Sequence, residues 1–198
     1  MNNRLRKWEL SLLIALCVSF CLGTWAQAKQ ENIAGSLVRL HVIAVSDDEE
    51  EQRIKLNVRD SVLRYLSPKL GDAADSDEAR RIIRSELDGI FAAASESACG
   101  RRVQVTLGEE YYPTKSYGSF SLPAGKYQSL RIILGDGEGH NWWCVVFPPL
   151  CVSAAETQSA LDTMSDDVRG IVSDDGYTVK FRVVELWGEL LKLVGAER

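Results

Sequence analysis

Two runs of strand-forming residues separated by a glycine-rich loop constrain the fold of this chain more than any other feature. Residues 127–134 and 142–147 are rich in β-branched and aromatic side chains, which favour extended backbone. The three glycines at alternate positions within residues 135–139 supply the positive φ angles that a chain reversal needs. The pattern predicts a β-hairpin. Pro148 and Pro149 cannot donate a backbone N–H, so the second strand should stop there or lie at a sheet edge.

The first residues have the layout of a secretory signal peptide. A basic stretch over residues 4–7 precedes an apolar run over residues 10–22, and Ala26 and Ala28 give the small-x-small pattern that a signal peptidase reads. The apolar run is about 13 residues long, shorter than the roughly 20 that cross a bilayer as a helix. We expect a signal peptide over residues 1–28 that is cleaved after Ala28, with an uncleaved anchor as the alternative.

The exported chain is expected to be an acidic single domain. The formal net charge of the whole chain is -5, and residues 1–28 hold three basic side chains and one acidic one, so their removal leaves -7. No cluster of Lys and Arg indicates nucleic acid or an anionic membrane as a partner. About 170 residues remain, enough for one domain with its own core. We expect a polar linker over residues 29–36 and one domain over residues 37–198.

Apolar periodicity predicts the remaining elements of that domain. In chain order they are a strand over residues 37–45, a helix with a Ser46 and Glu49 capping box that ends at Pro68, a helix over residues 76–98, a strand at 103–107, the hairpin, and two helices after Ser153 and from Thr178. In the first strand, Val38, Leu40 and Val42 share one face, and Arg39 and His41 lie on the other. The order predicts a mixed α/β domain of the α+β class, with a mostly antiparallel sheet and flanking helices.

Three cysteines follow the signal peptide. Outside the cytosol, a bend at the two prolines would bring Cys144 and Cys151 within disulfide range. The spacing also allows three buried thiols, because sequence separation does not fix the distance between Cα atoms. The odd count leaves Cys99 free or paired with another chain.

The sequence contains no assembled catalytic, metal or cofactor signature. His140 lies four residues before Cys144, but this cysteine follows two tryptophans in a predicted strand, so packing or a disulfide is favoured over a nucleophile. A strand follows the three glycines where a phosphate cradle needs a helix. Asp136 and Glu138 are too few ligands for calcium, and no set of zinc ligands is present. We expect no catalytic residue, no metal and no cofactor.

Aromatic side chains concentrated within residues 111–143 are the strongest physical pointer to function. The adjacent Trp142 and Trp143 must face opposite sides of a sheet. If helices cover only one face, one of these tryptophans stands at the surface and can anchor a partner. Packing of both in the interior is the favoured alternative for such large side chains.

Two segments carry a resemblance to one family. Residues 37–66 read LVRLHVIAVSDDEEEQRIKLNVRDSVLRYL, and residues 111–151 read YYPTKSYGSFSLPAGKYQSLRIILGDGEGHNWWCVVFPPLC. Both are similar to the stage II sporulation protein R family of endospore-forming bacteria, and NWWCVVFPPLC has an unusual composition. One departure is Val45 before Ser46, where the family usually has Asn, which changes the turn that enters the helix.

The resemblance implies a secreted signalling protein without turnover chemistry. It would be made in the forespore, exported into the space between forespore and mother cell, and there activate a membrane-embedded aspartic protease of the mother cell that processes pro-sigma-E. We expect that partner to be contacted through Tyr112, Lys115, Tyr117, Trp142 and Trp143. A cell-wall-binding module and a cell-wall hydrolase are the alternatives, in that order. Neither nucleic acid nor a small-molecule substrate is expected.

Overall fold

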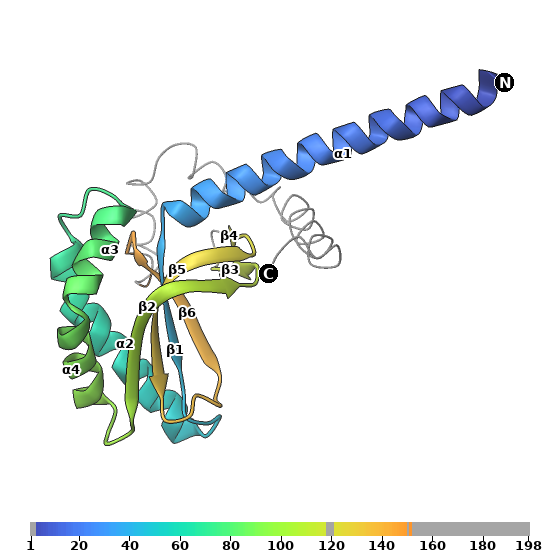
Figure 1. Ribbon diagram of the computed structural model, residues 1–198. Helices are drawn as coiled ribbons and strands as arrows, with labels where there is room; N and C mark the ends of the chain where they lie inside the picture. The colour runs from blue at the N-terminus through green and yellow to red at the C-terminus, as the bar shows by residue number, and fades with distance from the viewer. Residues whose placement is uncertain (1–2, 118–120, 150, 152–198) are drawn as a thin grey trace.

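A computed structural model of the chain describes residues 3–117, 121–149 and 151, which form a sheet with helices packed on one side (Figure 1). The helices predicted after Ser153 and from Thr178 lie outside the described residues. Within the described part, one strand precedes three helices, and the other strands of the sheet follow those helices.

Four strands form the main sheet: β1 (Val38–Ile43), β2 (Val103–Tyr112), β5 (Gly125–Leu134) and β6 (Asn141–Phe147). Their order is β2-β5-β1-β6; β1 and β5 run parallel, and the other neighbouring pairs run antiparallel. Strands β3 (Lys115–Ser116) and β4 (Ser121–Leu122) form a separate small sheet. The predicted α+β class with a mostly antiparallel sheet is confirmed, and β6 ends at an edge directly before Pro148, as expected.

The predicted hairpin between residues 127–134 and 142–147 is wrong, because β1 lies between the two strands. β5 and β6 each pair with β1 and not with each other. The glycine loop passes the end of β1, where the Gly139 N–H donates to the Ala44 carbonyl at 3.0 Å. Every residue of β1 is buried, so this strand needs cover on both faces and pairing on both sides, which a central position provides.

Helices α2 (Glu49–Leu70), α3 (Ser76–Ser85) and α4 (Leu87–Ser97) lie together on one face of the sheet, here called the helix-covered face (Figure 1). Val38, Leu40 and Val42 of β1 pack there against buried helix side chains, among them Ile54, Val58, Leu66, Ile83 and Ile90. The opposite side, here called the second face, carries Arg39 and His41. The predicted alternation along this strand is therefore confirmed.

Helix α2 begins and ends differently from the prediction. Its N-cap is Asp48, and Ser46 accepts the Asp48 N–H at 3.3 Å, so the predicted capping box with Glu49 is wrong. Glu49 is the first helical residue and lies too early to complete such a box. The helix continues through Pro68 to the buried Leu70, because a proline in the last turn removes only one backbone hydrogen bond from a helix that still packs on the core.

The single helix predicted over residues 76–98 is divided at Glu86 into α3 and α4. The Glu86 carboxylate accepts a hydrogen bond of 2.5 Å from the Tyr65 hydroxyl and pairs with Lys69 Nζ at 3.2 Å, both on α2. A Cβ atom at Gly89 would lie 1.8 Å from the Tyr65 hydroxyl oxygen, so the glycine allows α4 to approach α2 closely. Contacts with α2 determine where the helix breaks. The periodicity of the local sequence does not reveal such contacts.

Helix α1 (Asn3–Gly35) projects from the domain and joins it through its last turn (Figure 1). The segment predicted as a linker, residues 29–36, is helical as far as Gly35. Ile33 is 1% exposed and packs with Leu37 and Tyr127 on the second face. The last turn of α1 is therefore held by the core.

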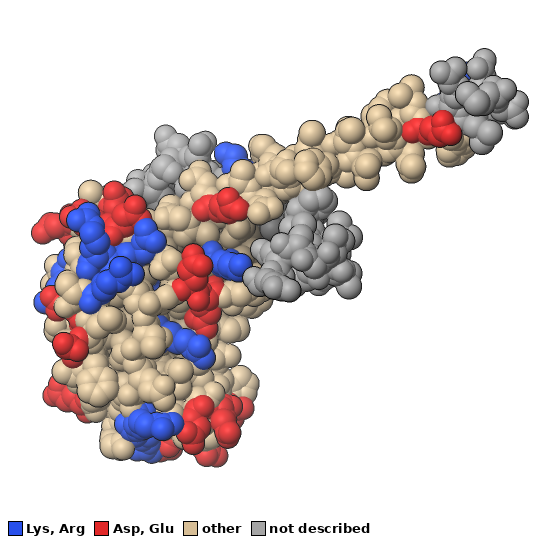
Figure 2. Space-filling view, viewed as in Figure 1, with Lys and Arg blue, Asp and Glu red and all other residues tan. Residues whose placement is uncertain are grey.

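The projecting part of α1 is apolar on all sides, and Figure 2 shows it with almost no charged surface. By length and composition, the stretch Lys7–Gly35 is sufficient to cross a membrane, a test that signal sequences near an N-terminus also pass. The helix is consistent with the predicted signal peptide.

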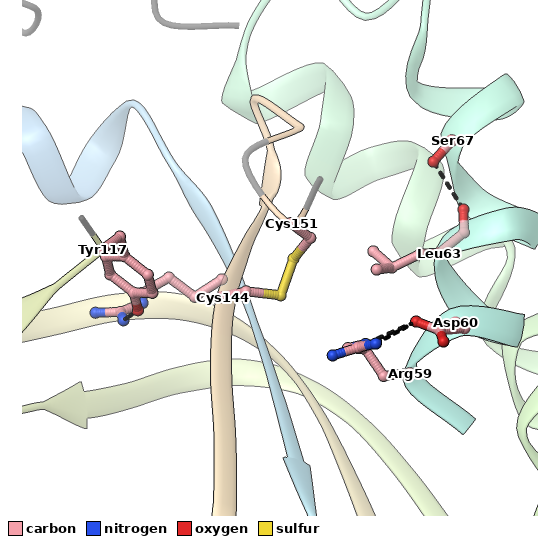
Figure 3. The surroundings of a disulfide bond; sticks show 8 residues. Arg59, Asp60, Leu63, Ser67, Tyr117, Cys144 and Cys151 are labelled. Atoms are coloured by element: carbon pink, nitrogen blue, oxygen red, sulfur yellow. Dashed lines mark hydrogen bonds and ion pairs between the residues drawn. A yellow bond between two sulfur atoms is a disulfide. The ribbon is translucent and has the colours of Figure 1, made fainter. Parts of the chain in front are cut away.

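Of the cysteine arrangements that the sequence left open, the structure contains a Cys144–Cys151 disulfide with a Cα–Cα distance of 5.5 Å. Cys144 is buried on the helix-covered face, and Figure 3 shows the bond directed toward α2, on the side of Leu63. Cys99 is free and exposed. The disulfide fastens the chain beyond the two prolines to strand β6.

Replacement of Ile33 tests whether the last turn of α1 belongs to the core. We expect Ile33→Ala to lower the free energy of unfolding by about 2–4 kcal/mol, because it leaves a cavity beneath a buried side chain. Urea unfolding of the full chain in a nonionic detergent measures this change. Leu22→Ala, in the same helix but at a position 56% exposed, should change it by less than about 0.5 kcal/mol. Equal effects of the two substitutions would contradict this assignment.

Removal of the disulfide tests its contribution to stability. The bond joins residues separated by 7 positions, so the double variant Cys144→Ser, Cys151→Ser should lose about 2–3 kcal/mol of unfolding free energy. Urea unfolding with and without a reductant measures the loss. The control Cys99→Ser should unfold as the unaltered protein does. An unaltered protein that is insensitive to the reductant would rule out a stabilising disulfide.

Candidate functional site

Aromatic and charged side chains gather on the second face of the sheet. Alternation along β1 places Arg39 there, and Tyr112, Tyr117 and Tyr127 surround it; these four residues are here called the Arg39 cluster. The cluster combines β1, the ends of β2 and β5, and the residue after β3. Four of the five predicted contact residues lie in or beside the cluster: Tyr112, Lys115, Tyr117 and Trp143.

Arg39 is the centre of the cluster and is fully buried. Its Cζ atom lies 3.8 Å from the ring centroid of Tyr112, 5.0 Å from that of Tyr127 and 5.8 Å from that of Tyr117. Its Nη2 group donates to the Tyr117 hydroxyl. Nε and Nη1 have no hydrogen-bond acceptor within the part of the chain that the structure describes. The aromatic faces attract the cation, but they leave two of its nitrogen atoms without an acceptor.

The three tyrosines remain neutral. Burial raises the pKa of the hydroxyl groups of Tyr112, Tyr117 and Tyr127, and the nearby Arg39 guanidinium lowers each pKa by a smaller amount. Neutral phenols supply ring quadrupoles and hydrogen-bonding oxygens, but no negative charge. The cluster therefore holds a buried positive charge that its own members do not balance.

A chain of hydrogen bonds supports the cluster from one side. Both ring nitrogens of His41 are engaged at 2.8 Å, Nδ1 with Glu110 and Nε2 with Asn141. Ser129 donates to the other Glu110 oxygen at 2.9 Å, and the Ser129 and Tyr112 hydroxyls lie 2.6 Å apart. Because neither nitrogen of His41 is available to take a proton from Ser129, the arrangement is not a nucleophile with its base. It orients the Tyr112 ring against Arg39.

The accessible rim of the site is formed by Trp143 and Lys115. Trp143 is half-buried, and its ring packs on His41 at 5.7 Å and on Tyr112 at 6.1 Å between centroids. Lys115 is exposed, and its Nζ atom lies 5.5 Å from the Trp143 ring centroid. Tyr112 is only 1% exposed, and its direct contact with a partner stays a prediction. It is covered by its neighbours and supports the rim from beneath.

Trp142 lies on the other side of the sheet. The predicted opposition of the two tryptophans is confirmed, since Trp142 packs on the helix-covered face, where the Arg59 guanidinium lies 4.3 Å from its ring centroid. Trp142 is half-buried beside α2, and its role as a contact residue alongside Trp143 stays a prediction. Figure 3 shows Arg59 and the disulfide on this side of β6, and Tyr117 on the opposite side.

Sequence reasoning placed Arg39 and His41 on the correct face but assigned them no role. A signal was available, because two cationic or titratable side chains alternate with apolar residues in a strand that is otherwise typical of a sheet interior. The contribution of Glu110 and Ser129 was not detectable, since β5 pairs with β1, and β2 with β5, only in the folded sheet. The Cys144 and His140 pair is not assembled: Cys144 is in the disulfide, and the exposed His140 pairs with Asp47.

Comparison with known proteins identifies a family for this site and its domain. The family described as Stage II sporulation protein R (spore_II_R) matches residues 34–157. Stage II sporulation protein R of Bacillus subtilis (strain 168) is 40% identical over 131 residues, which span 62% of this chain and 58% of that relative. No solved structure matches the chain. The family match begins in the last turn of α1 and includes the whole Arg39 cluster, so the chain belongs to the stage II sporulation protein R family.

Proposed function

We propose that this protein is an exported sporulation signal that binds and activates a membrane-embedded aspartic protease of the mother cell, the enzyme that processes pro-sigma-E. Family membership supports a role in stage II of sporulation. The apolar N-terminal helix is suited to export, and a disulfide is typical of proteins outside the cytosol. The space between forespore and mother cell is the compartment in which such a signal meets its receptor.

The proposed binding role rests on one observation: Trp143 and Lys115 form an accessible rim above the Arg39 cluster. Interface hot spots are rich in Trp, Tyr and Arg, and a tryptophan that is half-buried keeps a fixed orientation. The Arg39 cluster and the strands beneath hold this ring before any partner arrives, which lowers the entropic cost of binding. A ligand that binds the active state of a receptor more tightly than the inactive state shifts the receptor toward activity.

The alternative classes receive less support from the geometry. Lys115 lies over the Trp143 ring, where a cell-wall sugar would have to stack. A hydrolase acting through Cys144 would need a free thiolate, and this cysteine is in the disulfide. We therefore infer a role as a protein ligand without turnover chemistry.

A charge reversal at Lys115 tests the proposed docking face. Lys115 is exposed, so Lys115→Glu should leave the fold intact while it places a repulsive charge beside Trp143. We expect pro-sigma-E processing in sporulating cells to fall about tenfold or more. The matched control is Arg64→Glu on the exposed side of α2, which makes the same change in net charge and should process normally. Normal processing in Lys115→Glu would place the docking surface elsewhere.

The two tryptophans give a second test, because they lie on opposite faces. We expect Trp143→Ala to reduce processing about tenfold or more, because it removes the ring at the rim. Trp142→Phe keeps an aromatic ring beside Arg59 and should process at the normal level. Immunoblots of pro-sigma-E and of the exported protein measure processing and export in the same cells. The reverse pattern would assign docking to the helix-covered face.

A further inference from the structure

Arg39 is a buried cation without a counter-charge among the described residues. It is fully buried, and its Nε and Nη1 atoms have no acceptor there. The carboxylate nearest in the network, Glu110, is already engaged by His41 at 2.8 Å, by Ser129 at 2.9 Å and by Arg131 at 3.8 Å. Burial of an unpaired charge is costly, so a site of this kind gains from a ligand that supplies the opposite charge.

The chemistry of the site selects a carboxylate. A guanidinium is planar and weakly hydrated, and it donates several N–H groups in the plane that a carboxylate matches. Around it, the described strands carry the cations Arg39, Arg131 and Lys115 and the carboxylate of Glu110 on the second face. The described part of this face is therefore locally positive on a chain whose formal net charge is -5. An acidic ligand is complementary to it, and a basic or neutral ligand is not.

Tyr117 is the member of the Arg39 cluster that a ligand would displace to reach Arg39. Its hydroxyl accepts the Nη2 donor, and its ring is half-buried at the outer side of the cluster. It directly follows β3, which pairs with β4 through only two residue pairs, Lys115 with Leu122 and Ser116 with Ser121. A small sheet of this kind opens more readily than the main sheet behind it. A carboxylate that replaces the Tyr117 hydroxyl would reach the guanidinium without disturbing Tyr112 or Tyr127.

We propose that Arg39 binds an acidic side chain of the protein partner, whose carboxylate replaces the Tyr117 hydroxyl on the guanidinium. The inference deepens the proposed function and rests on it, because it names the chemistry of the partner at the same face. Trp143 and Lys115 then form the rim of the contact, and Arg39 supplies its central charged hydrogen bonds. The partner contributes an Asp or Glu side chain to this contact.

The direct test follows the Arg39 Nε–H resonance of the full-length protein by nitrogen-15 NMR in a nonionic detergent. N-acetylglutamate should shift this resonance in a saturable manner, and the neutral N-acetylglutamine should not. Arg39→Met should weaken N-acetylglutamate binding, followed at neighbouring resonances, about tenfold or more, because hydrogen bonds to a charged donor are lost. Absence of a shift, or binding that persists in Arg39→Met, would overturn the proposal. A shift with inorganic phosphate but not with N-acetylglutamate would also overturn it.

A variant that should bind more tightly keeps the proposal testable if Arg39→Met fails to fold. Tyr117→Phe removes the hydroxyl that competes for Arg39 and retains the ring, so N-acetylglutamate should bind about fivefold more tightly, the value of one net hydrogen bond. The matched control is Tyr65→Phe, which removes a hydroxyl on the helix-covered side and should leave the affinity unchanged. Unchanged or weaker binding in Tyr117→Phe would contradict replacement of the hydroxyl.

Processing in cells separates this inference from the proposed function. If Trp143→Ala and Lys115→Glu lose pro-sigma-E processing while Arg39→Met retains it, the docking face stands and the role of Arg39 is overturned. If Lys115→Glu retains processing while N-acetylglutamate still binds at Arg39, the carboxylate site stands and the proposed docking face falls. Loss of processing in all three variants, together with carboxylate binding, supports both.

Discussion

The central position of β1 is the constraint on which the rest of this structure depends. All six of its residues are buried, and its two neighbours satisfy its backbone on both sides. One face of the strand is apolar and receives the helices, whereas the other carries Arg39 and His41. A central strand with a charged residue on one face obliges the surrounding chain to build a polar and aromatic enclosure, and the candidate site is that enclosure.

The enclosure explains how a compact scaffold displays a binding surface. Arg39 and the hydrogen bonds from His41 through Glu110 to Ser129 fix the tyrosine rings, and those rings support Trp143. His41, Ser129 and Arg131 already contact the Glu110 carboxylate, so the positive charge of Arg39 has no counter-charge among the described residues. Rigidity and uncompensated charge thus arise from one arrangement. Both properties favour a protein ligand that is preorganised for an acidic partner.

Two attachments fasten the chain before β1 and after β6 to the rest of the described structure. The last turn of α1 packs Ile33 onto the second face, and the Cys144–Cys151 disulfide fastens the chain after β6 on the helix-covered face. The family match over residues 34–157 begins directly after Ile33 and includes both cysteines of the disulfide. A chain cut after Ala28 would retain the turn with Ile33, so cleavage at the predicted position and an intact core are compatible.

Local residue patterns determined the parts of this protein that depend on neighbours along the chain. The apolar run before Ala28, the opposition of Trp142 and Trp143, and the end of β6 at Pro148 all follow from periodicity or from the chemistry of proline. Strand alternation identifies which residues share a face, but it contains no information about which strand pairs with which. Insertion of β1 between β5 and β6, the break at Glu86 and the assembly of three tyrosines around Arg39 were decided only by tertiary packing, because they depend on contacts between residues far apart in the sequence.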